Sequence, residues 1–98
     1  MKHPVLIRPE AEADLQSTFE WYQQQEEGLG IEFLRCVEAS IFLISRSPKI
    51  FFPIYKGVRR VLTRRFPYGI FYIIAEGKVI VIAVLHVRRH SLRWQQRR

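Results

Sequence analysis

The sequence contains little of what marks a disulfide-rich, metal-binding or disordered chain. It has one cysteine in 98 residues, Cys36, so no internal disulfide can form and no cysteine spacing suggests a metal site. Only five glycines and five prolines accompany 48% hydrophobic residues, a composition that argues against disorder. We expect Cys36 to be a small core residue, and we expect neither a cofactor nor a metal.

Long apolar segments are also missing. The longest apolar run is Val79–Leu85, which is far shorter than the roughly 20 residues that span a membrane. The N-terminus has no apolar secretory core. We therefore expect a single domain over residues 1–98 that stays in the cytoplasm and makes no membrane contact.

Acidic residues are almost missing from the second half of the chain. Residues 1–50 hold five Lys or Arg against eight Asp or Glu, a net charge of −3, whereas residues 51–98 hold eleven against one, Glu76, a net charge of +10; together they give +7. Most of these cations alternate with apolar residues, so folded strands must hold them in place. Because a solvated face usually mixes both signs, the excess favours an acidic partner, either nucleic acid or an acidic protein.

Apolar spacing predicts one strand and two helices in the first half. The short apolar run Pro4–Arg8 suits a strand. Pro9 and the acidic residues after it suit the start of a helix, and apolar positions three and four apart continue that helix to about Glu27. After two nearby glycines a second pattern of this kind runs to Ser47-Pro48. Helices joined by so short a connection should pack antiparallel.

The second half predicts strands. After a looser stretch that contains Pro53, β-branched and aromatic runs predict strands over Val58–Phe66, Tyr68–Ala75 and Val79–His86, with Glu76-Gly77 as the turn of a hairpin. We therefore expect an α+β fold with an N-terminal strand, an antiparallel helical hairpin and a three-stranded antiparallel meander in one small sheet.

The last two strands are apolar on both faces. In the third, Val79, Val81, Ala83 and Leu85 alternate with Ile80, Ile82 and Val84. A helical hairpin covers only one face of a sheet, so the other face is either covered by the tail, Leu92–Arg98, or left for a partner.

Catalytic motifs are scarce. The sequence has no glycine-rich phosphate loop, and the basic half has no paired carboxylates, which excludes hydrolysis by two acids. Arginine can hold phosphate and histidine can pass a proton near neutral pH, so the remaining cations could cleave RNA. The alternative is that these residues only solvate the ends of apolar strands. They are His86, Arg88, Arg89 and His90 after the last strand and Arg59, Arg60, Arg64 and Arg65 on an earlier one.

The two tryptophans allow different interpretations. Trp94, after Arg93, could stack on a base or fill a hydrophobic pocket, but we expect it to fold back on the sheet. Trp21, beside Tyr22, is interpreted as a packing or rim residue.

Three segments of the basic half carry a resemblance to a known family. They are Arg59-Arg60-Val61-Leu62, Arg64-Arg65-Phe66-Pro67-Tyr68, and Val81–Leu85 running into His86-Val87-Arg88-Arg89-His90. Together they resemble the RelE/ParE superfamily of type II toxins. The opening, with its apolar strand, Pro9, Ala13-Asp14-Leu15 and Trp21-Tyr22, is similar to the start of ParE-type chains. The likeness covers nearly the whole chain.

The resemblance implies a small toxin held inactive by an antitoxin encoded in an adjacent gene, in a hetero-oligomeric complex. RelE-like members cut mRNA on the ribosome, whereas ParE-like members are associated with poisoning DNA gyrase. Arg60 and Arg89 fall where RelE-like enzymes keep cations for the scissile phosphate. Gly69, however, falls where they keep an essential arginine, and Trp94 falls about where they place a functional tyrosine.

The departures from the RelE pattern favour a non-catalytic gyrase inhibitor. Two alternatives stay open: a ribosome-dependent mRNA endonuclease, and a basic nucleic-acid-binding domain. Some relatives use a histidine near the end of the last strand, so the endonuclease would use Arg60, His86, Arg89 and His90. The residues expected to bind the target or the antitoxin are Arg59, Arg60, Arg64, Arg65, Arg88, Arg89, Arg93 and Trp94.

Overall fold

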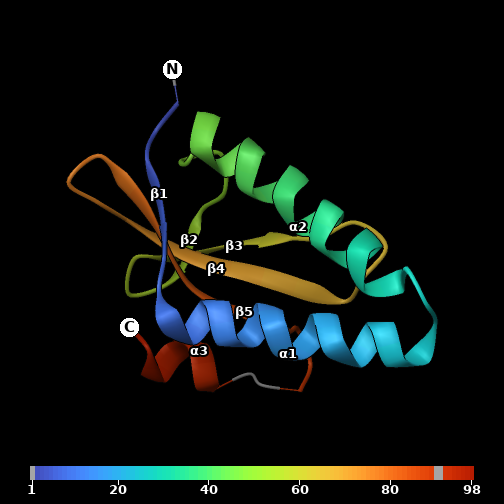
Figure 1. The fold of residues 1–98 in the computed structure, drawn as a ribbon. Coiled ribbons are helices and arrows are strands. Elements are labelled where there is room, and N and C mark those ends of the chain that lie inside the picture. The colour runs from blue at the N-terminus through green and yellow to red at the C-terminus, as the bar shows by residue number, and fades with distance from the viewer. Residues whose placement is uncertain (1, 90–91) are drawn as a thin grey trace.

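The fold is a five-stranded sheet with a helical hairpin packed on one face (Figure 1). The computed structural model describes residues 2–89 and 92–98. The strand order is β1-β5-β4-β3-β2, in which β1 runs parallel to β5 and the other neighbours are antiparallel. The elements are β1 (Val5–Ile7), α1 (Pro9–Gln25), α2 (Leu29–Arg46), β2 (Pro53–Tyr55), β3 (Val58–Leu62), β4 (Tyr68–Ala75), β5 (Lys78–His86) and α3 (Arg93–Gln96). None of the helices in the described residues is long and apolar enough to cross a membrane.

Local signals set the helical hairpin as predicted. Pro9 opens α1, and two glutamates lie in its first turn, where negative charge complements the helix dipole. Gly28 separates the helices with a φ of 90°, a conformation that glycine adopts without steric cost. Gly30 lets the helices approach closely, because a Cβ there would lie 2.6 Å from the carbonyl oxygen of Phe19.

The predicted hairpin between the last two strands is confirmed, and the strand before it is shorter than predicted. Glu76 and Gly77 have φ values of 53° and 74°, which is the turn geometry that matches the twist of paired strands. The strand predicted over Val58–Phe66 ends at Leu62. Arg65 has a φ of 70°, which an extended strand does not accommodate.

The edge strand β2 was not predicted. It pairs with β3 only through Pro53 opposite Arg59 and Tyr55 opposite Val58. A proline at its start lacks the N–H group that a sheet requires, which is why the sequence favoured a loop there. The structure tolerates the proline because β2 lies at the edge.

Both faces of the sheet are covered, each by its own apolar cluster. The helix-side core includes Ala11, Phe33, Val37, Ile44, Val61, Ile70, Tyr72, Val79, Val81 and Val84. The second-face cluster consists of Val58, Phe71, Ile73, Ile82, Ala83, Leu85 and Trp94. Trp94 comes from α3, and its ring stacks on Phe71 at a centroid distance of 4.7 Å. The expectation that Trp94 folds back on the sheet is therefore confirmed, and of the two alternatives for the second face the structure shows the tail.

The predicted alternation along β5 is wrong beyond Ile82. Phe71 pairs with Ala83 and Tyr72 with Val81, so Ile82 is an extra residue without a partner on β4. Ile82 and Ala83 both join the second-face cluster, and Val84 returns to the helix side. A β-bulge of this kind reverses the orientation of every later side chain.

Candidate functional site

The two arginines of β3 lie on opposite faces of the sheet. Arg59 donates to the backbone carbonyl of Phe51 and acts electrostatically on Tyr72, which belongs to the helix-side core. Arg60 lies over Gly69 on the other face, where a Cβ at Gly69 would meet the Arg60 Cδ at 3.0 Å and the Phe71 ring at 3.3 Å. The stem of Arg60 thus fills the space that a side chain on the middle strand would need.

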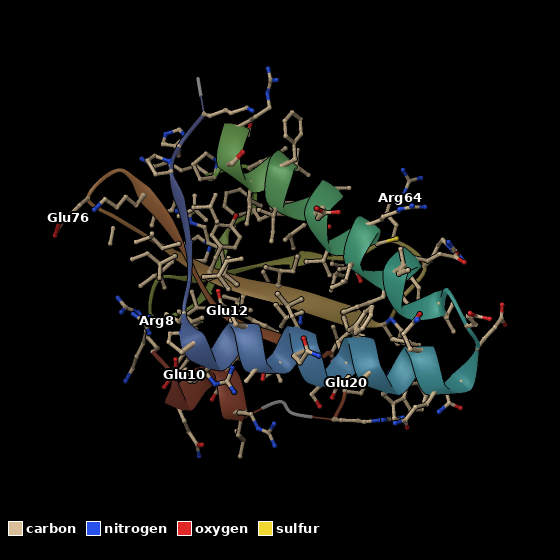
Figure 2. All side chains as sticks on the ribbon, viewed as in Figure 1. Arg8, Glu10, Glu12, Glu20, Arg64 and Glu76 are labelled. Carbon is tan, nitrogen blue, oxygen red and sulfur yellow. The ribbon has the colours of Figure 1, made fainter. Side chains whose placement is uncertain are left out.

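The next pair of arginines lies in the loop between β3 and β4. Figure 2 shows Arg64 projecting outward, at the opposite end of the molecule from Glu76 on the hairpin tip. Arg65 forms an exposed ion pair with Glu32 of α2 at 2.7 Å. The hydrogen bond and the charge of that carboxylate raise the pKa of Arg65 above its usual value. One of the two loop cations is therefore partly neutralised.

The residues after β5 lie toward the helix side. The His86 Nδ1 accepts a hydrogen bond from the Arg88 backbone N–H at 3.1 Å, and its ring lies 5.5 Å from the ring of Tyr68, which packs against the helix-side core. Arg88 and Arg89 are exposed. His90 lies outside the described residues. The candidate endonuclease residues are therefore split, because Arg60 lies on the second face and His86 on the helix side.

Trp94 is not on the surface. It is 8% exposed, and Tyr55 packs edge-on against the ring that stacks on Phe71. A partner can reach this ring only if α3 leaves the sheet. Arg93, at the start of α3, is exposed.

A buried ion pair between Asp14 and Arg97 holds α3 in place, and no pattern in the sequence predicted it. Arg97 donates to both carboxylate oxygens of Asp14, at 2.6 and 3.2 Å, and to the carbonyl of the unpaired Ile82 at 3.1 Å. Asp14 also accepts the N–H of Val84 at 3.0 Å. The pair therefore joins α1, α3 and the bulge of β5, and no local pattern could have signalled it because its partners are 83 positions apart.

A groove of about 970 Å³ lies between α2 and β3. Its apolar lining comes from Cys36, Ala39, Leu43, Phe51, Val61 and Leu62, and its cations are Arg35, Arg60, Arg64 and Arg65. Within the described residues no strand pairs with the outer side of Arg60–Leu62, so β3 has an open edge here. Cys36 is half-buried at the margin of the core rather than within it.

The sequence predicted three of the four groove cations, Arg60, Arg64 and Arg65, but neither Arg35 nor the apolar half of the groove. Leu43 and Leu62, which are 40% and 54% exposed, were not identified as surface residues from the sequence. The available signal was the apolar content of α2, which exceeds what one face of a helix requires. Within the described residues no group of three His, Cys, Asp or Glu side chains could hold a metal ion.

A smaller pocket of about 280 Å³ lies at the other edge of the sheet, between α1 and β5. Arg89 and Arg93 are the cations in its lining. Trp21 lines the pocket as well, so it lies at the rim of this pocket, one of the two positions expected for it.

A helical hairpin on one face of a small mixed sheet is the arrangement of the RelE/ParE fold. The model of the ParE toxin family of the type II toxin-antitoxin system, parDE, matches residues 5–91. The chain therefore belongs to this family. No curated protein sequence matches it significantly.

Solved structures agree on the fold. The chain is similar to the chromosomal ParDE toxin-antitoxin system from P. aeruginosa, with a TM-score of 0.77 and 11% identity over 87% of this chain and 96% of that one. It is similar to the toxin-antitoxin complex RelBE2 from Mycobacterium tuberculosis, with a TM-score of 0.64 and 22% identity over 88% and 99%. For a free E. coli RelE mutant the TM-score is 0.62 and the identity 12%, over 94% and 90%.

Proposed function

We propose that an acidic antitoxin segment neutralises this toxin by occupying the groove between α2 and β3, and that the free toxin inhibits DNA gyrase. The observation that carries the first part is the groove itself, which combines an open strand edge, exposed apolar side chains and a cationic rim. The ParDE and RelBE2 structures are toxin-antitoxin systems, which supports a partner of this kind.

The groove offers a partner two kinds of contact. The outer edge of Arg60–Leu62 presents backbone groups to which an extended segment can add as a strand. Exposed apolar side chains such as Leu43 and Leu62 suit the apolar face of a helix. Because four arginines and one glutamate line the groove, the matching segment carries acidic residues beside its apolar ones. A segment with that composition is disordered when free and becomes ordered on binding.

Co-expression with the adjacent reading frame tests whether the antitoxin occupies the groove. Wild-type toxin and antitoxin should elute together from a size-exclusion column at low salt. Ala39→Trp places a bulky, uncharged side chain in the groove from an exposed helix position, and Ala13→Trp makes the same change on α1 as the matched control. A side chain that obstructs the groove should weaken binding by about 2 kcal/mol, roughly 30-fold, for Ala39→Trp alone. Separate elution of the wild-type proteins, or equal effects of both variants, would contradict the proposal.

Two observations support the proposal of gyrase inhibition. The chain belongs to the ParE toxin family, and the sheet separates the side chains that RNA cleavage would need. Arg60 and His86 lie on opposite faces, and Gly69 leaves the middle strand without a cation. A catalytic site for RNA cleavage needs its groups within reach of one phosphate. The exposed cations that remain together are Arg88, Arg89 and Arg93, and these suit a protein interface in which a few arginines supply most of the binding energy.

The gyrase proposal is tested by supercoiling and cleavage-complex assays run beside primer extension on translated mRNA. Wild-type toxin should inhibit gyrase and leave transcripts intact. Arg89→Ala and Arg93→Ala should each weaken inhibition by about 2 kcal/mol, whereas Lys78→Ala, on the hairpin turn at the far end of β5, should change it little. Codon-phased cuts in the transcript with gyrase unaffected would establish the endonuclease instead.

A further inference from the structure

The pocket between α1 and β5 occupies a gap at the edge of the sheet. β1 pairs with β5 only at Val79–Val81, so the later residues of β5 have no strand on that side within the described residues. α1 covers this edge instead, and Ser17, Thr18 and Trp21 line the pocket from the helix. Across the pocket lie Tyr68 and the two arginines that follow β5. The groove between α2 and β3 lies at the opposite edge of the sheet.

The charge of this pocket is positive and is not internally compensated. Within the described residues Arg89 and Arg93 have no acidic partner within ion-pair distance. The carboxylate that lines the pocket is Asp14, and it is already bound by Arg97 and by the backbone N–H of Val84. Two guanidinium groups are thus available to an anion, and guanidinium groups bind phosphate through a planar set of donors.

The pKa of Tyr22, near the end of α1, responds to the positive charge of Arg89. Burial raises the pKa of Tyr22, and the neighbouring Tyr68 raises it further, whereas the positive charge of Arg89 acts in the opposite direction. Arg89 and Trp21 both line the pocket, so the two side chains can contact one ligand.

The walls of the pocket supply an aromatic surface and hydroxyl groups. Trp21 is 48% exposed, and its ring contacts that of Tyr22 in an edge-to-face arrangement at a centroid distance of 5.0 Å. Ser17 and Thr18 bring hydroxyl groups that can donate to or accept from a polar ligand. An exposed aromatic face beside free arginines is the arrangement on which nucleic-acid bases stack while their phosphates are neutralised.

We propose that this pocket binds one nucleotide of single-stranded nucleic acid, with the base on Trp21 and the phosphate between Arg89 and Arg93. A volume of about 280 Å³ limits the ligand to a group of this size. A carboxylate side chain would use the arginines but would leave the ring of Trp21 unused. The inference goes beyond the proposed function, because the ligand is nucleic acid rather than gyrase protein, and its test contains no gyrase.

The test is a titration of full-length toxin with 5′-phosphorylated trinucleotides, one of RNA and one of DNA. The chain has two tryptophans, so in a Trp94→Phe background the fluorescence comes from Trp21 alone. Binding should quench it, and a preference between the two probes identifies the source of the nucleotide. Loss of base stacking in Trp21→Ala should raise Kd roughly tenfold or more, with partial rescue in Trp21→Phe.

Arg88 supplies the matched control for the arginines. Arg88 and Arg89 are adjacent, exposed and equally charged, but only Arg89 lines the pocket. Arg89→Ala should raise Kd about tenfold, whereas Arg88→Ala should raise it less than about threefold, because removal of an exposed charge weakens only the general attraction to the phosphates. Equal effects, an unquenched Trp21, or displacement by an acidic peptide as effective as the trinucleotide would overturn the proposal.

Discussion

At the scale of single residues, Asp14 joins distant parts of the fold through a largely buried carboxylate. Its side chain is 7% exposed, and it bonds Arg97 and the Val84 N–H, which joins α1, α3 and β5. Such a pair gains little over well-packed apolar residues, but removing one partner leaves a buried charge uncompensated.

We therefore expect Asp14→Ala to lower the free energy of unfolding by about 3 to 5 kcal/mol. Glu32→Ala is the control, since the ion pair of Glu32 with Arg65 is exposed and should contribute less than about 1 kcal/mol. Urea unfolding of the two variants measures the difference. Equal losses would show that Asp14 has no special structural role.

Tyr72 makes stability depend on pH at the alkaline end. Its hydroxyl donates to the carbonyl of Pro48 at 2.8 Å inside the core, and burial raises its pKa above the usual 10.0, with Arg59 partly opposing the rise. The folded state therefore holds the phenolic proton more tightly than the unfolded state does. The resulting stability is fully present below pH 10 and is lost as the pH rises toward the folded pKa.

Tyr72→Phe should lower the free energy of unfolding by about 1 to 2 kcal/mol at pH 8, because the carbonyl of Pro48 loses its buried donor. Its unfolding free energy should also fall less between pH 9 and 11 than that of the wild type. Urea unfolding across this range tests both statements. A variant that loses stability as steeply as the wild type would assign the alkaline effect to another group, such as Tyr22, whose pKa is also raised by burial.

At the scale of elements, α3 owes its position to tertiary contacts. A helix of four residues, Arg93–Gln96, has no stability of its own. It is held by Trp94 on Phe71, by the Asp14–Arg97 pair, and by Arg8, which donates to the Arg97 carbonyl at 3.1 Å. The second face of the sheet is thus covered mainly through one side chain.

Trp94→Ala should lower the free energy of unfolding by about 3 to 5 kcal/mol, since it removes a large ring from a packed cluster. Leu92→Ala is the control two positions earlier, because Leu92 is 63% exposed and its loss should lower the free energy of unfolding by about 0.5 kcal/mol or less. Urea unfolding compares the two. Similar small effects would mean that α3 leaves the sheet readily in solution, where Trp94 would then be open to a partner.

At the scale of the whole molecule, the basic half surrounds both sheet edges. The cations of the groove and those after β5 lie at opposite edges, and Glu76, the acid of that half, lies at the hairpin tip (Figure 2). A surface charged in this way attracts an acidic partner. Salt screens the attraction, because the Debye length falls from about 10 Å at 0.1 M to about 3 Å at 1 M ionic strength.

The association rate of toxin and antitoxin should therefore fall steeply as salt rises, by about tenfold or more between 0.05 and 0.5 M, while the dissociation rate changes less. Ala39→Trp should act mainly on dissociation, because it changes the shape of the groove and leaves the net charge unchanged. Stopped-flow kinetics of the wild type and this variant separates the two effects. An association rate that does not change with salt would show that electrostatic attraction does not drive the association.

What the sequence by itself determined is local. Pro9 and Gly28 set the limits of the helices, and Glu76-Gly77 set the hairpin, because each acts through the conformation of its own backbone. The faces of β4 followed from its alternation, with Ile70 and Tyr72 toward the helices and Phe71 and Ile73 away from them.

What only the tertiary structure decided depends on contacts between distant segments. The bulge at Ile82 reversed the faces of the rest of β5, which separated His86 from Arg60 and moved the later arginines toward α1. Asp14 and Arg97 meet there and bind the backbone groups of Val84 and Ile82, which lie beyond the end of the β1 pairing. A pattern of residue types records which side chains alternate, but not where a strand gains an extra residue. The place of that residue depends on the pairing and packing of the whole sheet.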